Sequence, residues 1–429
     1  MSGPRQVYEF LKASSIAHAQ WDYEVSMSII KNRKKLLVLL LLLAPILVVS
    51  LLNATTLLGG KEAYAPAFYS TNIFIVSIVI GLAAGLITGC IGAGGGFVIT
   101  PALMAAGVKG ILAVGTDMFH IFAKAIMGTA VHKKLGNVSW KLAIAFLVGS
   151  GGGTFVGGYL NRLFYSINPI LSDAFISTIY SVILGFLGFY ALFDFLKLRK
   201  GDTGGGAHAS GPSATTNIAV KLQSIKVPPM ISFDEDFVPG GKRISWLVVA
   251  IGGLVVGILA TLMGAGGGFV TFPIFVYIYG VSSMTTVGTD ILQIIFTAGL
   301  GAIGQYAIYG YVFYTLAMGM LIGSLIGIQV GALTTKVVKG IHIRGFFAVS
   351  ILAGFVNRFS TLPKKMVELE IVNIPKSITS NMEFVGNILF WIVMAAFGLW
   401  VFAKFFSNIA TLREETKVDT IRAKPATAK

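Results

Sequence analysis

The sequence contains a long internal repeat. Residues 92–98 read Gly-Ala-Gly-Gly-Gly-Phe-Val, and residues 264–270 read the same letters 172 positions later. Three further features recur in the same order. A proline follows each run (Pro101 and Pro273), and a Val-Gly-Thr-Asp block comes next (residues 114–117 and 287–290). Three glycines spaced by four then follow, at residues 149, 153 and 157 and at residues 323, 327 and 331. Ordered matches of this kind indicate a duplicated unit, which constrains the architecture more than any other sequence feature. We therefore expect two homologous halves, at roughly residues 71–200 and 244–366.

The two halves are too apolar for a water-soluble fold. Hydrophobic residues make up 55% of the 429 residues and charged residues 12%, whereas soluble domains carry about 25% charged residues. The apolar stretches reach about 20 residues, the length at which a helix crosses about 30 Å of hydrocarbon. We expect an all-α polytopic membrane protein with about ten membrane-spanning helices. They are predicted near residues 36–58, 73–91, 111–131, 138–160, 170–196, 244–264, 286–308, 312–335, 344–360 and 384–404.

Two short apolar pieces lie between the long ones, near residues 97–108 and 269–279, and glycines bound each of them. Because they are too short to span a membrane, they favour broken or re-entrant helices. Outside the two halves, six further parts are expected: an amphipathic interfacial segment at 1–35, an extra transmembrane helix at 36–58, a cytoplasmic linker at 201–243, a loop at 367–383, a last transmembrane helix at 384–404 and a cytoplasmic tail at 405–429.

The net charge of +15 arises from Lys and Arg residues that cluster beside the apolar segments. A nucleic-acid partner would favour one continuous basic face, so this pattern indicates membrane topology instead. Basic clusters on the inner side place the N-terminus, the linker and the C-terminus in the cytoplasm, with the chain in the inner (cell) membrane. The first half then enters from outside and the second from inside, so the repeats are inverted, as in many secondary transporters. One miscounted span would make them parallel.

The Gly-Ala-Gly-Gly-Gly runs are the first candidate site. Glycine tolerates positive φ and allows a ligand to approach the backbone, so successive N–H groups can cradle an anion. The substrate-binding residues predicted from the two runs are Gly94, Gly95, Gly96, Gly266, Gly267 and Gly268. Alternatively, these glycines only permit a tight bend and close packing, which is the role we expect for the glycines spaced by four. A nucleotide-binding loop is disfavoured because no Lys-Ser or Lys-Thr pair follows either run.

The two Thr-Asp pairs are the second candidate. An intramembrane carboxylate costs at least a few kcal/mol, so it needs a partner or a water-filled cavity. Each pair begins a set of polar residues on one helical face, at corresponding positions of the halves: Asp117, His120 and Lys124, and Asp290, Gln293 and Thr297. We predict substrate binding for Thr116, Lys124 and Thr289, and proton coupling or gating for Asp117, His120, Asp290 and Gln293. The alternatives are that Thr or Asp caps a helix N-terminus and that Lys124 neutralises Asp117 or extends toward Lys133.

The glycine runs, each followed by a proline and a Gly-Thr-Asp within a multi-helix repeat, resemble the TauE/SafE sulfite exporter family. The resemblance covers roughly residues 71–366 and resumes in the last helix. It implies a secondary transporter that exports sulfite, a sulfonate such as sulfoacetate, or a related small anion by alternating access. The implied partners are a small anionic substrate, a coupling proton or ion, and the lipid bilayer, but no nucleic acid.

Several alternatives stay open. An anion channel, or an importer of another small anion, would share these features. An intramembrane enzyme is disfavoured because we find no serine with an aligned base and no His pair at metal-binding spacing, while Cys90 is the only cysteine. A membrane scaffold would not explain duplicated acidic residues beside helix breaks. We therefore expect no catalytic residue, no metal and no cofactor, and we leave open whether the chain forms a homodimer.

Overall fold

The computed structural model of the chain describes residues 70–91, 95–132, 139–200, 217–234, 241–335, 337–338 and 340–408. Three predicted parts lie wholly or mostly outside these residues: the interfacial segment 1–35, the helix at 36–58 and the tail at 405–429.

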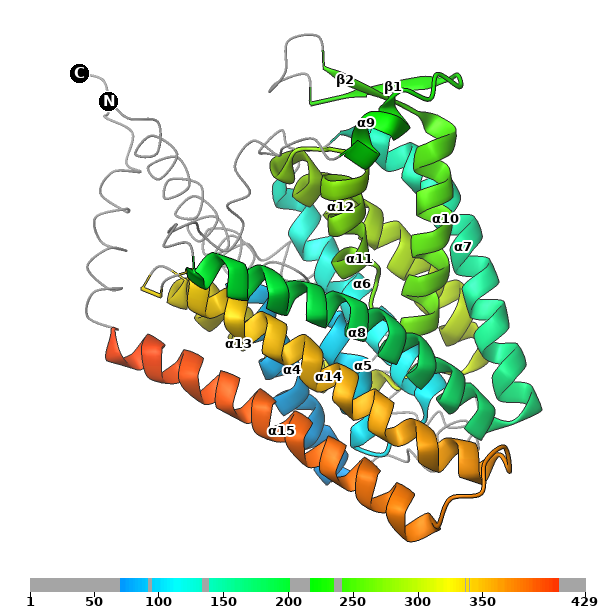
Figure 1. Ribbon diagram of the computed structural model, residues 1–429, viewed down its shortest axis with the longest axis vertical. Helices are drawn as coiled ribbons and strands as arrows, with labels where there is room; N and C mark the ends of the chain where they lie inside the picture. Colours follow the sequence, from blue (N-terminus) through cyan, green and yellow to red (C-terminus); the bar gives the residue numbers. More distant parts are fainter. Residues whose placement is uncertain are drawn as a thin grey trace, which may run out of the picture.

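Helices form almost all of the described chain (Figure 1). The first half contains α4 (Thr71–Ile91), α5 (Gly96–Ala105), α6 (Gly110–His132), α7 (Trp140–Ile167) and α8 (Pro169–Lys200). The second half contains α10 (Trp246–Met263), α11 (Gly268–Pro273), η1 (Ile274–Ile278), α12 (Ser283–Gly299), η2 (Leu300–Tyr306), η3 (Ala307–Tyr309), α13 (Tyr314–Thr334), α14 (Gly340–Glu368) and, as the last helix, α15 (Lys376–Ser407). Eight helical stretches in the described residues are long and apolar enough to cross a membrane. The expected fold class, an all-α polytopic membrane protein, is therefore confirmed.

The predicted spans in the described residues each coincide with helix, and the two short apolar pieces correspond to α5 and to α11 with η1. The predicted span at 286–308 is not one regular helix. After α12 the backbone widens into the π-helical segment η2, tightens into the 3-10 turn η3, and ends at Gly310, whose φ is +75°. A π-helical segment inside a helix often marks a functional or strained position.

The glycines spaced by four hold the two halves together. On α7, a Cβ added at Gly157 would lie 2.7 Å from the carbonyl oxygen of Ile258 on α10. On α13, a Cβ added at Gly331 would lie 2.6 Å from the carbonyl oxygen of Leu86 on α4. Because α4 and α10 are equivalent, as are α7 and α13, the same pairing occurs twice, and each pairing joins one half to the other. The packing role expected of these glycines is confirmed.

Equivalent helices that meet between the halves run antiparallel. Early residues of α8 lie beside late residues of α14, as in the 3.8 Å pair of Asp173 with Lys365, and the order is reversed at the other end, where Asp194 lies 3.4 Å from Arg344. Helices α6 and α12 are also antiparallel. Gly299 at the end of α12 faces Phe122, and η2, which follows α12 in the chain, faces residues nearer the start of α6. Repeats related by an axis along the membrane normal would place such pairs parallel, so this packing is that of inverted repeats.

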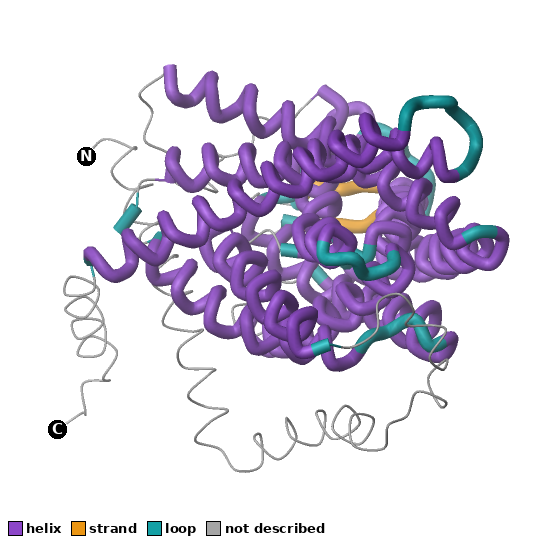
Figure 2. Tube along the Cα trace, turned by 90° about the horizontal axis from the view of Figure 1, so that it is seen from below, coloured by secondary structure: helices purple, strands orange, loops and turns teal. Residues whose placement is uncertain are grey.

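A small structure that we call the hairpin cap consists of α9 (Asn217–Gln223), β1 (Met230–Phe233) and β2 (Lys242–Ser245). The strands are antiparallel and lie at the top of Figure 1, behind the helices in the view from below of Figure 2. Asp234 accepts hydrogen bonds from Ser282 N (2.7 Å) and Ser282 Oγ (2.8 Å). Gln223 donates to Tyr279 O and Lys242 to Gly280 O. The cap therefore fixes the turn between η1 and α12.

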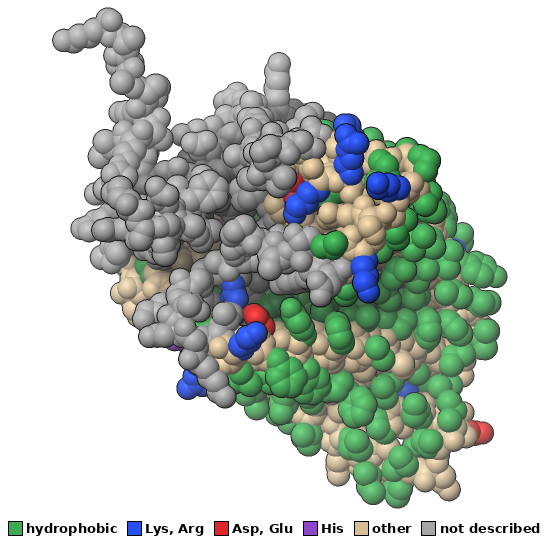
Figure 3. All heavy atoms as spheres, turned by 45° about the horizontal axis from the view of Figure 1, so that its top comes forward, with side chains coloured by type: hydrophobic (Ala, Val, Ile, Leu, Met, Phe, Trp, Pro, Cys, Tyr) green, Lys and Arg blue, Asp and Glu red, His purple; other side chains and the backbone are tan. Residues whose placement is uncertain are grey.

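The surface separates by chemistry. Apolar side chains cover much of the side of the helical body, whereas Lys and Arg gather around the hairpin cap (Figure 3). The basic residues at that end are Lys141, Lys221, Lys226, Lys242 and Arg243. Large apolar side chains are exposed on the outer faces of α7 and α8, among them Phe155, Tyr159, Phe186 and Phe193. A surface of this kind is stable in contact with lipid and not with water.

Candidate substrate-binding site

The two glycine-rich breaks meet between the halves. Gly96 begins α5, and a Cβ added there would lie 2.9 Å from both the Cα and the carbonyl oxygen of Ala265 in the second run. Gly264 of the second run lies equally close to α6, because its added Cβ would be 2.7 Å from Val114 Cα. The predicted Gly94 lies outside the described residues. The described glycines of the two runs are therefore brought together.

Glycine is required in the two runs for different reasons. In the second run, Gly264, Gly266 and Gly267 have φ values of +76°, +64° and +88°, which side chains with a Cβ rarely adopt. In the first run, Gly95 has an ordinary φ of −70°, but a Cβ would lie 2.6 Å from the carbonyl oxygen of Ala84. Close approach therefore selects glycine in the first half, and backbone conformation selects it in the second. A Cβ added at Gly268 would lie 3.2 Å from Asp290 Oδ2, so this glycine is close to the Asp290 side chain.

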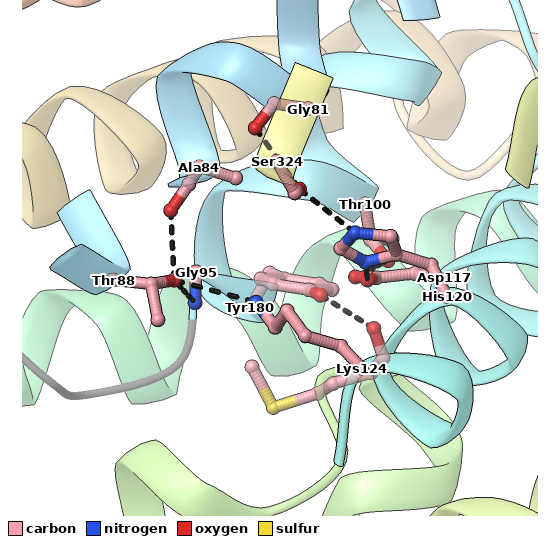
Figure 4. Close-up of polar contacts among 11 residues, drawn as sticks. Gly81, Ala84, Thr88, Gly95, Thr100, Asp117, His120, Lys124, Tyr180 and Ser324 are labelled. Carbon is pink, nitrogen blue, oxygen red and sulfur yellow. Dashed lines mark hydrogen bonds and ion pairs between the residues drawn. The ribbon is translucent and has the colours of Figure 1, made fainter. Parts of the chain in front are cut away.

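A fully buried polar cluster lies beside the first break (Figure 4). Thr100 donates a hydrogen bond to Asp117 Oδ2 at 3.0 Å, and His120 Nδ1 lies 3.8 Å from Asp117 Oδ1. On its other side, His120 Nε2 is 2.9 Å from Ser324 Oγ, and Ser324 donates to the carbonyl of Gly81 at 3.1 Å. The cluster thus links α5 and α6 of the first half to α13 of the second.

Two atoms of this cluster are under-satisfied. Asp117 Oδ1 and His120 Nδ1 are buried and have no hydrogen-bond partner within the described chain. Leaving a buried polar atom unpaired costs roughly 1–3 kcal/mol, so such positions are unusual in a well-packed interior. A carboxylate and an imidazole that face each other at this distance are suited to holding or exchanging a proton.

Lys124 is directed toward the first break. Its Nζ lies 3.4 Å from Thr88 Oγ1, and the same oxygen accepts a 2.8 Å hydrogen bond from the Gly95 backbone N–H (Figure 4). Thr88 in turn donates to the carbonyl of Ala84 at 2.8 Å. Among the described residues, no carboxylate lies within 4.0 Å of Lys124. Lys124 and Asp117 therefore form no direct ion pair, although their charges act on each other electrostatically.

The second half builds a counterpart of this cluster in which Gln293 and Thr297 take the positions of His120 and Lys124. Gln293 donates to Asp290 Oδ1 at 2.9 Å, and Thr297 donates to Gln293 Oε1 at 2.9 Å. Thr297 Oγ1 is also 2.9 Å from Ser150 Oγ on α7. Ser150 and Ser324 each follow the first glycine of a four-spaced set. Ser150 contacts α12 of the second half, and Ser324 contacts α6 of the first half. We did not single out these serines from the sequence, although their place inside the repeated glycine sets was a usable signal.

Thr116 and Thr289 each accept a backbone hydrogen bond from the opposite half. Thr116 Oγ1 accepts from Phe313 N at 2.9 Å, before α13, and Thr289 Oγ1 accepts from Ser139 N at 3.1 Å, before α7. Both hydroxyl oxygens thus take part in contacts between the halves. The helix-capping alternative for the Thr-Asp pairs is wrong, because both pairs lie well inside α6 and α12, and Ser282 is the residue that caps α12.

Comparison with known proteins agrees with this architecture. The family model for sulfite exporter TauE/SafE matches residues 77–357. Probable membrane transporter protein YunE of Bacillus subtilis is 26% identical over 272 residues, which cover 60% of this chain and 87% of the relative. Probable membrane transporter protein YjnA of the same organism is 24% identical (59% and 87% covered), and a probable membrane transporter protein of Methanocaldococcus jannaschii is 22% identical (66% and 94% covered). No solved structure matches the chain significantly. A match over most of a duplicated helical core means that the chain belongs to the TauE/SafE sulfite exporter family and is a membrane transporter.

Proposed function

We propose that the chain is a secondary transporter that exports a small sulfur-containing oxyanion, sulfite or a sulfonate such as sulfoacetate, by alternating access. One observation carries the proposal: the glycine-rich breaks of two antiparallel halves touch at Gly96 and Ala265, beside the buried Asp117 cluster and Lys124. Broken helices that meet between inverted repeats form the substrate site in many secondary transporters.

The chemistry of the breaks suits an oxyanion. Backbone N–H groups of Gly96 and Gly266 to Gly268 provide donors without bulky side chains, and Lys124 provides positive charge beside them. The Gly95 N–H, which donates to Thr88 in this conformation, becomes a further donor once that hydrogen bond opens. Gly96 and Ala265 are too close to admit an anion between them in this conformation. In the proposed cycle, the breaks therefore separate when the halves move and close again after the anion has passed.

Proton coupling and gating are assigned to the two acidic clusters. Asp117 and His120 lie within 3.8 Å of each other without a hydrogen bond, so proton transfer between them needs little movement. Asp290 already accepts from Gln293. The first half is therefore the proposed proton-exchanging half, and the second half is the proposed gate that follows it.

The basic end of the molecule sets the proposed orientation. Cytoplasmic loops of membrane proteins carry an excess of Lys and Arg. The hairpin cap, with Lys141, Lys221 and Arg243 near it, is accordingly placed in the cytoplasm, together with the linker and both termini of a chain in the inner membrane.

Transport by purified protein in liposomes tests the proposal. We expect labelled sulfite or sulfoacetate to accumulate against its own gradient when a proton gradient is imposed, with no movement in protein-free liposomes. Equilibration without accumulation would make the chain an anion channel. No movement of either oxyanion, under any imposed ion gradient, would overturn the proposed substrate class.

A further inference from the structure

Arg358 is a buried cation that the sites described above do not use. Its side chain is 2% exposed, and it lies in α14, a helix long and apolar enough to cross a membrane. An arginine at such a position costs at least a few kcal/mol, so it requires a partner. Arginines of this kind commonly mark substrate or ion pathways.

Among the described residues, Arg358 makes one hydrogen bond, to a neutral side chain. Its Nε donates to Asn357 Oδ1 at 2.7 Å, and Asn357 donates to Asn387 on α15 at 2.6 Å. In the part of the chain that the structure describes, the two terminal nitrogens of the guanidinium have no hydrogen-bond partner, and no carboxylate lies within 4.0 Å of it. The two terminal nitrogens of this buried guanidinium are thus available to bind a ligand.

The two nearby acidic residues are occupied elsewhere. Asp173 and Glu383 act on Arg358 electrostatically but do not pair with it. Asp173 accepts from Gly110 N at 2.8 Å, and Glu383 accepts from Lys364 at 2.7 Å. Both carboxylates therefore stabilise the charge of Arg358 from a distance but leave its two terminal nitrogens without a direct partner among the described residues.

Arg358 lies on the side of α14 that packs against the first break. One turn before it, Gly354 faces the carbonyl oxygen of Phe97, the second residue of α5, at 3.9 Å from an added Cβ. Across from α14, Tyr180 of α8 has Arg358 and Asp117 among its electrostatic neighbours. The Tyr180 hydroxyl donates to the carbonyl of Met263, which immediately precedes the second break (Figure 4). Arg358 and Asp117 thus both lie within electrostatic range of Tyr180.

We propose that Arg358 binds the transported oxyanion through its two terminal nitrogens, at a second position on the path, within electrostatic range of Tyr180. This inference rests on the proposed function and specifies its substrate class further. A guanidinium matches two oxygens of one anion in a bidentate fork, whereas a halide offers only one point of contact. Arg358 accordingly favours sulfite and sulfonates over chloride.

Binding measurements on purified protein test the assignment. Wild type, Arg358→Gln and Arg358→Lys are each titrated with sulfite and with chloride. The matched control for the loss of one positive charge is Arg344→Gln, on the same helix. We expect Arg358→Gln to weaken sulfite binding by roughly 10-fold to 100-fold, since a hydrogen bond to a charged group carries about that factor. The sulfite affinity of Arg358→Lys should lie between those of wild type and Arg358→Gln, with a reduced preference for sulfite over chloride. The sulfite affinity of the Arg344→Gln control should stay within about threefold of wild type.

The outcomes separate this inference from the proposed function. If wild type binds and transports sulfite while a folded Arg358→Gln or Arg358→Lys protein keeps its affinity and selectivity, the inference is wrong and the proposed function stands. If wild type binds no oxyanion, the proposed function itself fails. Should neither variant fold, hydrogen exchange of the wild type decides, because sulfite must slow exchange in residues 354–362, and unchanged exchange there overturns the inference.

Discussion

The packing of α7 on α10 can be tested with two alanines on one helix. In Gly149→Ala, the new methyl would overlap the carbonyl of Ala250, and even the next atoms, Ala250 C and Leu254 N, would lie at 2.7 and 2.8 Å. In Gly152→Ala, three residues further along, the nearest atom is Leu254 Cδ1 at 3.7 Å, which is an ordinary contact. The two variants have the same chemistry and differ only in what the methyl meets.

The magnitudes follow from that difference. Alanine is favoured over glycine by about 1 kcal/mol in a helix, and this gain applies to both variants. Gly149→Ala must also move backbone atoms of α10, which cannot rotate away as a side chain can, and overpacking typically costs about 1–3 kcal/mol. Because the contact is between backbones, we place this variant at or above the upper end of that range, for a net loss of about 2 kcal/mol. Gly152→Ala should be neutral or stabilising by up to about 1 kcal/mol.

Thermal unfolding in detergent measures the contrast. At about 2.1 cal/mol/K per residue, 1 kcal/mol corresponds to roughly 1 °C for a chain of 429 residues, so Gly149→Ala should unfold about 2 °C below wild type. Gly152→Ala should unfold at or slightly above the wild-type temperature. Equal shifts for the two variants, or a lower temperature for Gly152→Ala, would refute the close backbone contact between the halves.

Three further predictions concern the site and the cap. Lys124→Met should weaken oxyanion binding about 10-fold, because the positive charge beside the first break is lost, whereas Lys141→Met at the surface should not; titration of both variants with sulfite checks this. Gly267→Val should destabilise the chain by roughly 1–3 kcal/mol, since a residue with φ of +88° must accept a Cβ, and unfolding in detergent measures the loss. Asp234→Ala removes two hydrogen bonds to Ser282 and should lower stability by about 1–3 kcal/mol, with faster hydrogen exchange confined to the turn before α12.

The arrangement of helices was largely predictable from the repeat. A stretch such as 170–196 is predominantly apolar and corresponds to α8, because length and hydropathy together determine where a helix can cross lipid. Glycine spacing also predicted close packing, but it could not identify the partner helix. Gly149 on α7 and Gly323 on α13 carry the same local pattern, and only the fold shows that each meets the opposite half.

The polar clusters were predictable only in part. The spacing of Asp117, His120 and Lys124 predicts a shared helical face, and only the structure shows that all three lie near the first break. The contact of His120 with Ser324 joins residues 204 positions apart, which local spacing cannot predict. Arg358 was overlooked although it and Arg344 are the two cations of the predicted span 344–360, and a cation within an apolar stretch was itself the signal.

The most direct test of the central claim is the position of a bound anion. Electron cryo-microscopy of the protein in lipid with selenite, a heavier analogue of sulfite, would show where the oxyanion is held. Our account predicts density in contact with the glycine-rich breaks around Gly96 and Gly266, within reach of Lys124. Density bound only outside both breaks, in a preparation that transports the anion, would contradict the claim that the meeting point of the two halves is the substrate site.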